Sequence, residues 1–61
     1  MQIQALEILV VEASEALRAA MVAQLQGLGA RHITAEASPA DALQRMRGQR
    51  FDVVLSGWNM K

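Results

Sequence analysis

The short apolar run Ile8-Leu9-Val10-Val11 constrains the fold of this chain more than any other feature. A run of this length that is apolar at every position and rich in β-branched residues is typical of a strand buried on both faces. Strands of that kind occur inside parallel sheets, where helices cover each face. We place this strand at residues 5–11 and expect the rest of the chain to build a sheet around it.

Two helices with strong start signals follow this strand. Ser14 is expected to cap a helix over residues 15–28, which Gly29 ends in a left-handed conformation. Ser38 is expected to cap a second helix over residues 39–47, with Pro39 at its first position. Both helices carry apolar residues at three- and four-residue spacing, namely Leu17, Ala20, Met21, Leu25 and Leu28 in the first and Ala42, Leu43 and Met46 in the second.

Two further strands are expected at residues 32–36 and 51–56. The first is short and polar, which favours an edge strand, and the second contains the apolar run Val53-Val54-Leu55. Strands that alternate with helices imply right-handed crossovers and a parallel sheet between helices. The sequence therefore predicts an α/β fold of the form β-α-β-α-β, in one domain over residues 1–61.

Composition narrows the classes of function. The chain has 61 residues, no cysteine, a single histidine and a formal net charge of zero. These values disfavour disulfides, a Cys/His zinc site, and attraction to nucleic acid or to an anionic membrane. No apolar run approaches the length of a membrane span and residues 1–5 lack a basic leader, so we expect a cytoplasmic protein without a cofactor. A core this small favours oligomerisation as a further source of stability.

Four stretches of the sequence carry a resemblance to a known family. They are Ile8-Leu9-Val10-Val11-Glu12, Leu28-Gly29, Ala40-Asp41-Ala42-Leu43 and residues 51–60, which read FDVVLSGWNM. From Ile8 to Lys61 the chain resembles, without a gap, the first half of a receiver domain, the phospho-accepting module of bacterial response regulators, and most of all the chemotaxis receiver. The resemblance implies half of a flavodoxin-like doubly wound fold, truncated after the third strand, with a three-stranded parallel sheet in the order 2-1-3.

The resemblance also locates the site at which receivers are phosphorylated, and the chain departs from the family there. Gly57 stands where the family carries its aspartate nucleophile, and glycine has no side chain that could attack phosphorus. The acidic pair that holds magnesium in receivers is here Glu12-Ala13, which leaves Glu12 only a weak relic candidate for a metal ligand. We expect no catalytic residue, no bound metal and no enzymatic activity, and phosphorylation at Glu12 or Asp52 instead is disfavoured.

Other side chains that could serve catalysis or anion binding have simpler explanations. Two serines cap helices, the histidine begins an edge strand and three arginines complement a helix C-terminus; these residues are Ser14, Ser38, His32, Arg45, Arg47 and Arg50. Lys61 could mimic a lysine that receivers carry later in the chain, but it would have only Glu12 to neutralise. None of these residues predicts an active site.

These observations favour a non-phosphorylatable receiver-like protein that acts through protein–protein interaction and self-association in two-component-type signalling. The third strand would lack a neighbour on its outer side, and a two-fold axis would pair it antiparallel with the same strand of a second copy. We expect an obligate homodimer with a six-stranded sheet of order 2-1-3-3′-1′-2′. Its interface residues would be Phe51, Asp52, Val53, Val54, Leu55, Ser56, Trp58 and Met60.

The resemblance implies a further partner. In receivers the histidine kinase docks largely on the first helix, so Glu15, Arg18 and Val22 are the expected docking residues of this chain. The alternative interpretation is a truncated or engineered fragment of a response regulator, which would fold only when a complementary fragment or a partner supplies the missing strands.

Overall fold

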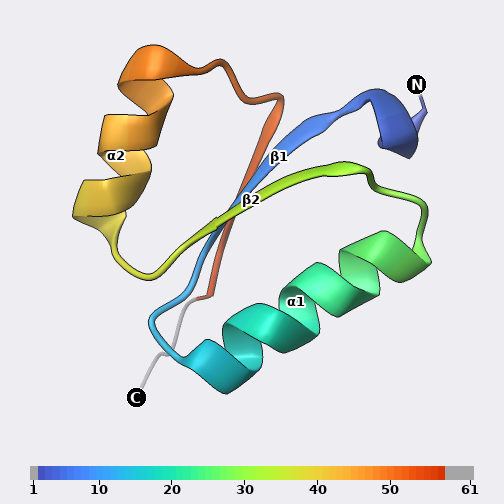
Figure 1. The fold of residues 1–61 in the computed structure, drawn as a ribbon, viewed down its shortest axis with the longest axis horizontal. Helices are drawn as coiled ribbons and strands as arrows, with labels where there is room; N and C mark the ends of the chain where they lie inside the picture. The colour runs from blue at the N-terminus through green and yellow to red at the C-terminus, as the bar shows by residue number, and fades with distance from the viewer. Residues whose placement is uncertain (1, 58–61) are drawn as a thin grey trace.

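The structure, a computed structural model, describes residues 2–57. A short 3-10 turn, η1, comes first, and strands and helices then alternate along the chain (Figure 1). In order, the elements are η1 (Ile3–Ala5), β1 (Glu7–Val11), α1 (Glu15–Gly27), β2 (His32–Glu36), α2 (Pro39–Gly48) and β3 (Val53–Ser56). The β-α-β-α-β succession predicted from the sequence is confirmed.

The three strands form one parallel sheet in the order β2-β1-β3. Ile8 of β1 is in register with Ile33 of β2 on one side and with Val53 of β3 on the other. The central position of β1 and the edge position of β2 are therefore as predicted. The fold is α/β, and its strand order is that of half a flavodoxin-like doubly wound sheet.

The core lies on both faces of β1. Successive side chains of a strand point to opposite faces, and the two helices lie on opposite sides of the sheet, so each face of β1 is covered (Figure 1). The side chains of Ile8, Leu9 and Val10 are at most 2% exposed. The cluster beneath α1 contains Ile8, Val10, Ala30, Met21 and Leu25, and the cluster beneath α2 contains Leu9, Val11, Ala42 and Phe51.

Both helices begin at the predicted caps. The Ser14 hydroxyl accepts a hydrogen bond from the Leu17 amide at 3.3 Å, and the Ser38 hydroxyl accepts one from the Asp41 amide at 3.2 Å. Each cap satisfies one of the amide groups that the first turn of a helix leaves without an intrahelical partner. Gly29 follows α1 with φ of 104°, the left-handed conformation predicted for it.

Two strands are shorter than predicted. The strand expected at residues 5–11 starts at Glu7, because Ala5 belongs to η1 and donates its amide hydrogen to the Gln2 carbonyl at 3.0 Å. β2 starts only at His32, opposite Glu7, so no neighbouring strand extends to residues 5 and 6. The strand expected at residues 51–56 starts at Val53, the first residue of β3 that is in register with β1.

The helix ends differ from prediction by a single residue each. Helix α1 ends at Gly27, with Leu28 as its C-cap, and α2 extends through Gly48. The last turn of a helix frays, so an offset of one residue has no consequence for packing.

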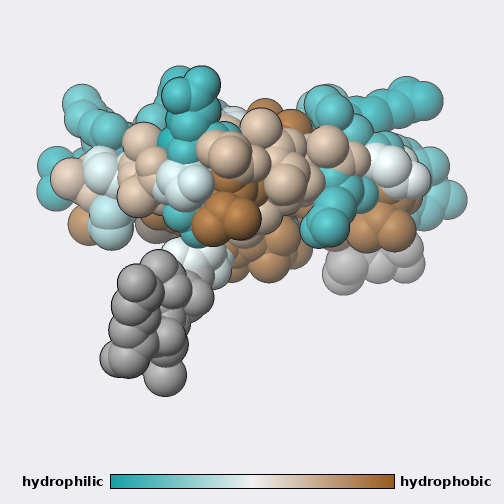
Figure 2. Space-filling model, turned by 90° about the horizontal axis from the view of Figure 1, so that it is seen from below, coloured by the Kyte–Doolittle hydropathy of each residue, from teal (hydrophilic) through white to brown (hydrophobic). Residues whose placement is uncertain are grey.

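Several apolar residues expected in the core are exposed instead. Each helix packs mainly over β1 and β2, so a sheet this narrow buries only part of each apolar helical face. The exposed fractions are 55% for Leu17, 69% for Leu28, 57% for Leu43 and 40% for Met46. Seen from below, the molecule carries hydrophobic residues across the middle of its surface and hydrophilic ones toward the upper margin and the ends (Figure 2). Among the residues that the structure describes, no helix is long and apolar enough to cross a membrane.

Candidate functional site

The sequence-predicted site lies at the carboxyl ends of β1 and β3. Because the strands are parallel and adjacent, Glu12 after β1 and Gly57 after β3 come side by side, and the Gly57 amide donates a hydrogen bond to the Val11 carbonyl at 2.7 Å. A cavity of about 330 Å³ opens at this end of the sheet. Its lining residues are Val11, Glu12, Ala13, Ala37, Pro39, Ser56 and Gly57.

The carboxylate of Glu12 fills the space that a side chain at position 57 would use. Glu12 is only 9% exposed, and its Oε2 accepts a hydrogen bond from the Ser14 amide at 2.7 Å. A Cβ atom added to Gly57 would lie 2.6 Å from Cδ of Glu12 and would overlap its Oε1. The sequence analysis singled out both residues, but only the structure shows that the Glu12 carboxylate occupies the space next to the Gly57 Cα atom.

The backbone and a neighbouring arginine hold Glu12 in this position. The Glu12 amide donates to the Glu36 carbonyl of β2 at 3.0 Å, and the Glu12 carbonyl accepts from Nη1 of Arg18 at 2.9 Å. The loop from β1 to α1 is thereby tied to both β2 and α1, which fixes the direction in which the Glu12 side chain leaves the chain.

A magnesium ion, which the receiver resemblance implies, does not fit these residues. Magnesium requires several oxygen ligands in near-octahedral geometry. Here one carboxylate is present, one of its oxygens already accepts the Ser14 amide, and Gly57 contributes no side chain. Within residues 2–57 no group of three or more acidic, histidine or cysteine side chains is placed to hold a metal ion.

Asp52 lies at the opposite end of the sheet from Glu12. Its Oδ2 accepts a hydrogen bond from the Glu7 amide at 2.9 Å, and its own amide donates to the Glu7 carbonyl at 2.8 Å. Glu7 also accepts from Nε2 of Gln49 at 3.1 Å and lies 3.7 Å from Nδ1 of His32. The hydrogen bonds of Asp52 and Gln49 join the start of β1 to the residues before β3, and they give Asp52 a structural role that the sequence pattern did not reveal.

Some of the expected interface residues pack against the core of their own chain, and others are exposed to solvent. Phe51 packs against the chain's own core beneath α2, and Val53 and Leu55 are half-buried against the cluster beneath α1. Val54 is 47% exposed and Ser56 is exposed. Trp58 and Met60 of the expected interface, and Lys61, lie outside the described residues.

The outer edge of β3, called here the β3 edge (Val53–Ser56), presents backbone groups as well as side chains. In a parallel ladder, the residues of a strand direct their amide and carbonyl groups alternately to one side and the other. Because Gly57 donates inward to Val11, the alternation directs Val53 and Leu55 toward β1, and Val54 and Ser56 outward. Within residues 2–57, no strand pairs with that outer side.

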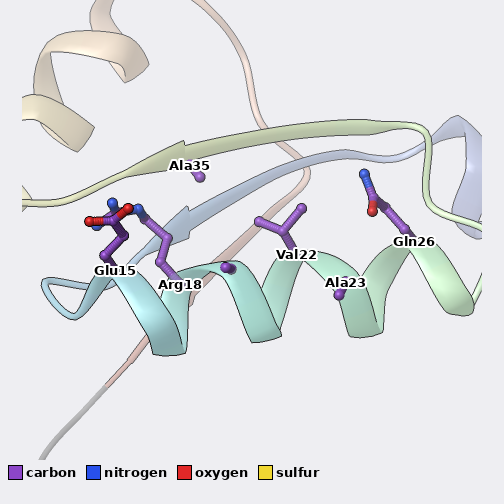
Figure 3. A pocket seen from close by; sticks show the side chains of 7 residues that line it. Glu15, Arg18, Val22, Ala23, Gln26 and Ala35 are labelled. Carbon is purple, nitrogen blue, oxygen red and sulfur yellow. The ribbon is translucent and has the colours of Figure 1, made fainter.

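The expected docking residues lie together in a groove between α1 and β2. Glu15 and Arg18 lie near the start of α1, and Val22 points toward the sheet further along the helix (Figure 3). The groove has a volume of about 300 Å³. It is lined by Glu15, Arg18, Ala19, Val22, Ala23, Gln26 and Ala35.

The basic residues of α2 are part of the surface of the fold. Nε of Arg45 lies 2.6 Å from Oε2 of Glu36, in an ion pair whose arginine is largely exposed. This contact links the last residue of β2 to α2, and the sequence interpretation did not include it. Arg45, Arg47 and Arg50 are all exposed, as expected for charges near a helix end.

No family model matches the chain, and comparisons with curated proteins and with solved structures found no significant match. The likeness to receiver domains therefore stays a prediction from the sequence motifs.

Proposed function

We propose that this chain is a receiver-like interaction protein of cytoplasmic two-component-type signalling, which acts by self-association and does not accept a phosphoryl group. The observation that carries this proposal is the β3 edge. It presents outward backbone amides and carbonyls together with an exposed valine, and natural proteins rarely leave such an edge unprotected.

The two edges of the sheet differ in how well they are protected, which favours β3 as the surface for self-association. Charged side chains lie at one end of β2, where Glu36 pairs with Arg45. Charges of this kind discourage a further strand from adding to an edge. β3 carries none in Val53–Ser56, and neither helix packs mainly over it.

The contact between Glu12 and Gly57 supports the absence of phosphorylation. Phosphoryl transfer to a protein needs a nucleophilic side chain, and an acyl phosphate needs a carboxylate that can be approached in line. Position 57 has no side chain, while the Glu12 carboxylate is buried and accepts the Ser14 amide. Incubation with acetyl phosphate and magnesium is expected to leave the intact mass unchanged, and a phosphoryl adduct would contradict this part of the proposal.

The groove beside α1 supports a second binding event, in which a histidine kinase or another signalling protein contacts Glu15, Arg18 and Val22. These side chains lie on one side of α1 (Figure 3), but Arg18 is already bonded to the Glu12 carbonyl. Charge reversal at Glu15 would weaken a kinase contact without changing self-association, because α1 packs mainly on β1 and β2, away from the β3 edge.

Size-exclusion chromatography with light scattering tests self-association. The chain is expected to elute at micromolar concentration with about twice its mass of 6.6 kDa. A lysine at position 54 would place a charge on the β3 edge, so Val54→Lys is expected to elute as a monomer. Ala35→Lys, on an exposed residue of the opposite edge strand, is the matched control and should remain a dimer.

A folded monomer of the unmodified chain at this concentration would refute self-association. Circular dichroism separates the fragment interpretation from the proposal, since a fragment that needs a complementary piece would show no cooperative melting on its own.

A further inference from the structure

We infer that β3 pairs with β3 of a second copy in one particular antiparallel register, with Leu55 opposite Leu55 on the two-fold axis. This inference rests on the self-association proposed above and specifies how the two copies meet. It follows from which backbone groups of the β3 edge point outward and from how many of them each symmetric register can satisfy.

The outward groups belong to two residues. The alternation along β3 leaves the amide and carbonyl of Val54 and of Ser56 directed away from β1, while Leu55 between them bonds inward. In an antiparallel pair, two opposing residues that both point toward the partner exchange two hydrogen bonds. Each copy therefore offers two residues that can form such hydrogen-bonded pairs.

The register centred on Leu55 satisfies all of these groups. It places Val54 opposite Ser56 of the second copy, and by symmetry Ser56 opposite Val54, so that every outward amide and carbonyl of Val53–Ser56 finds a partner. A register centred on Val54 would place Ser56 opposite Asp52, whose amide is already bonded to the Glu7 carbonyl at 2.8 Å. A register centred on Ser56 would leave Val54 without a partner in the other β3.

Side chains favour the same register. The two Leu55 residues would form a non-hydrogen-bonded pair, in which the Cα atoms approach to about 4.5 Å and the side chains are closest. Leu55 lies on the α1 side of the sheet and is half-buried in its own chain, so a second leucine would cover the part that remains exposed. On the other face, the 47% exposed Val54 would lie beside Ser56.

The charge of the chain permits a second copy as the occupant of this edge. The formal net charge is zero and Val53–Ser56 carries no charged residue, so two copies do not repel one another as a whole or at the edge. The edge is also its own complement, because a two-fold axis brings outward amides of one copy opposite outward carbonyls of the other.

Disulfide trapping distinguishes the registers, since the chain has no cysteine of its own. Val54→Cys and Ser56→Cys place one thiol each at exposed positions, which leaves the core intact. Opposed residues of a hydrogen-bonded pair have Cα atoms about 5.5 Å apart, within the range of a disulfide, whereas residues offset by two positions are about 7–8 Å apart and are outside it.

The two variants are refolded together in reducing buffer and then oxidised, and each is also oxidised alone. The expected result is a crosslinked species of about twice 6.6 kDa in the mixture, which mass spectrometry identifies as one chain of each variant. Each variant alone should give no more dimer than Ala35→Cys, which reports chance collisions from the opposite edge strand. Circular dichroism of every variant confirms that it is folded.

Any other result of the crosslinking or light-scattering experiments would contradict either the register or the self-association. Efficient crosslinking of Val54→Cys alone would place the two-fold axis at residue 54. Efficient crosslinking of Ser56→Cys alone would place it at residue 56. Either result would overturn the register centred on Leu55. Absence of crosslinks in a chain that light scattering shows to be a dimer would overturn the register centred on Leu55. A monomer in light scattering would instead overturn the proposed self-association itself.

Discussion

At the scale of single residues, the most informative contact joins Glu12 and Gly57. Neither residue is unusual by itself, since a glutamate after a strand is commonly solvated and a glycine commonly marks a turn. In the fold the carboxylate is buried, is held by the Ser14 amide at 2.7 Å and occupies the space beside the Gly57 Cα atom. The glycine therefore leaves room for the Glu12 carboxylate, and its backbone conformation is not left-handed.

Gly57→Ala tests this contact. The new methyl group would displace the Glu12 carboxylate from the Ser14 amide, and we expect the free energy of unfolding to fall by about 0.5–1.5 kcal/mol in urea denaturation, the net contribution of one hydrogen bond. In a Glu12→Ala background the same substitution should cost much less, because the obstacle is gone.

Gly27→Ala is the matched control for this prediction. A Cβ at Gly27 meets nothing within 4 Å, and alanine stabilises a helix relative to glycine by about 0.5–1 kcal/mol. If Gly57→Ala were as well tolerated as Gly27→Ala, the buried carboxylate would not be where we describe it.

At the scale of elements, the capped helix starts are the part of the fold that the local sequence determines most directly. Ser14 and Ser38 each accept an amide hydrogen from the residue three positions later, as their sequence positions predicted. The buried faces of the helices were predicted less well. α1 buries only part of its apolar stripe, and α2 buries Ala42 while Leu43 and Met46 are exposed.

Ser38→Ala is expected to lower the free energy of unfolding by about 1 kcal/mol, because the Asp41 amide loses its acceptor. Ser38→Asp retains an acceptor at the same position and should restore most of the stability. Thermal unfolding followed by far-UV circular dichroism measures both. If both variants lost the same amount of stability, the cap hydrogen bond would not be the reason for the effect of Ser38.

A pair of substitutions on α1 tests which apolar residues form the core. Leu25 packs against the cluster beneath α1, so Leu25→Gln is expected to cost about 1–3 kcal/mol. Leu17 is 55% exposed, so Leu17→Gln should change the free energy of unfolding by no more than about 0.5 kcal/mol. Leucine and glutamine have similar helix propensities, which makes the comparison one of burial. Similar costs at the two positions would contradict the described packing of α1.

At the scale of the whole molecule, the two edge strands differ in charge, since β2 contains Glu36 while Val53–Ser56 of β3 contains no charged residue. The ion pair of Glu36 with Arg45 lies beside β2, while the β3 edge carries a half-buried leucine and an exposed valine. Two helices over three strands bury little apolar surface, and a small core leaves a narrow margin of stability. Pairing of two β3 strands would both protect the edge and enlarge the core.

Coupling between folding and association predicts that the melting temperature depends on protein concentration. For the unmodified chain it should rise by roughly 3–5 °C for each tenfold increase in concentration, because mass action favours the dimer. Val54→Lys should abolish this dependence, whereas Ala35→Lys should preserve it. A melting temperature of the unmodified chain that does not change with concentration would count against a dimer that folds and associates in one step.

Local patterns were sufficient to predict the succession of strands and helices, both helix caps and the left-handed Gly29. Each of these depends on interactions within a few residues: an apolar run of strand length, a serine before a helix, a glycine after one. The strand order was predicted from the resemblance to receivers, and the structure confirms it. Strand ends were predicted less well, because β1 and β3 begin where a neighbouring strand is available for pairing, and that depends on the other strands.

Only the tertiary structure determined which of the predicted residues lie in contact with one another. Glu12 and Gly57 are 45 positions apart in sequence, and no periodicity says that the carboxylate of one fills the place of the other's side chain. The exposure of Leu17 and Leu43 likewise depends on the width of the sheet beneath their helices. Backbone conformation depends mainly on residues that are near in sequence, so the amino-acid pattern determined the strands and helices. Burial and steric exclusion depend on every element that packs at a given place, so the packing around the sheet determined the arrangement of Glu12 and Gly57.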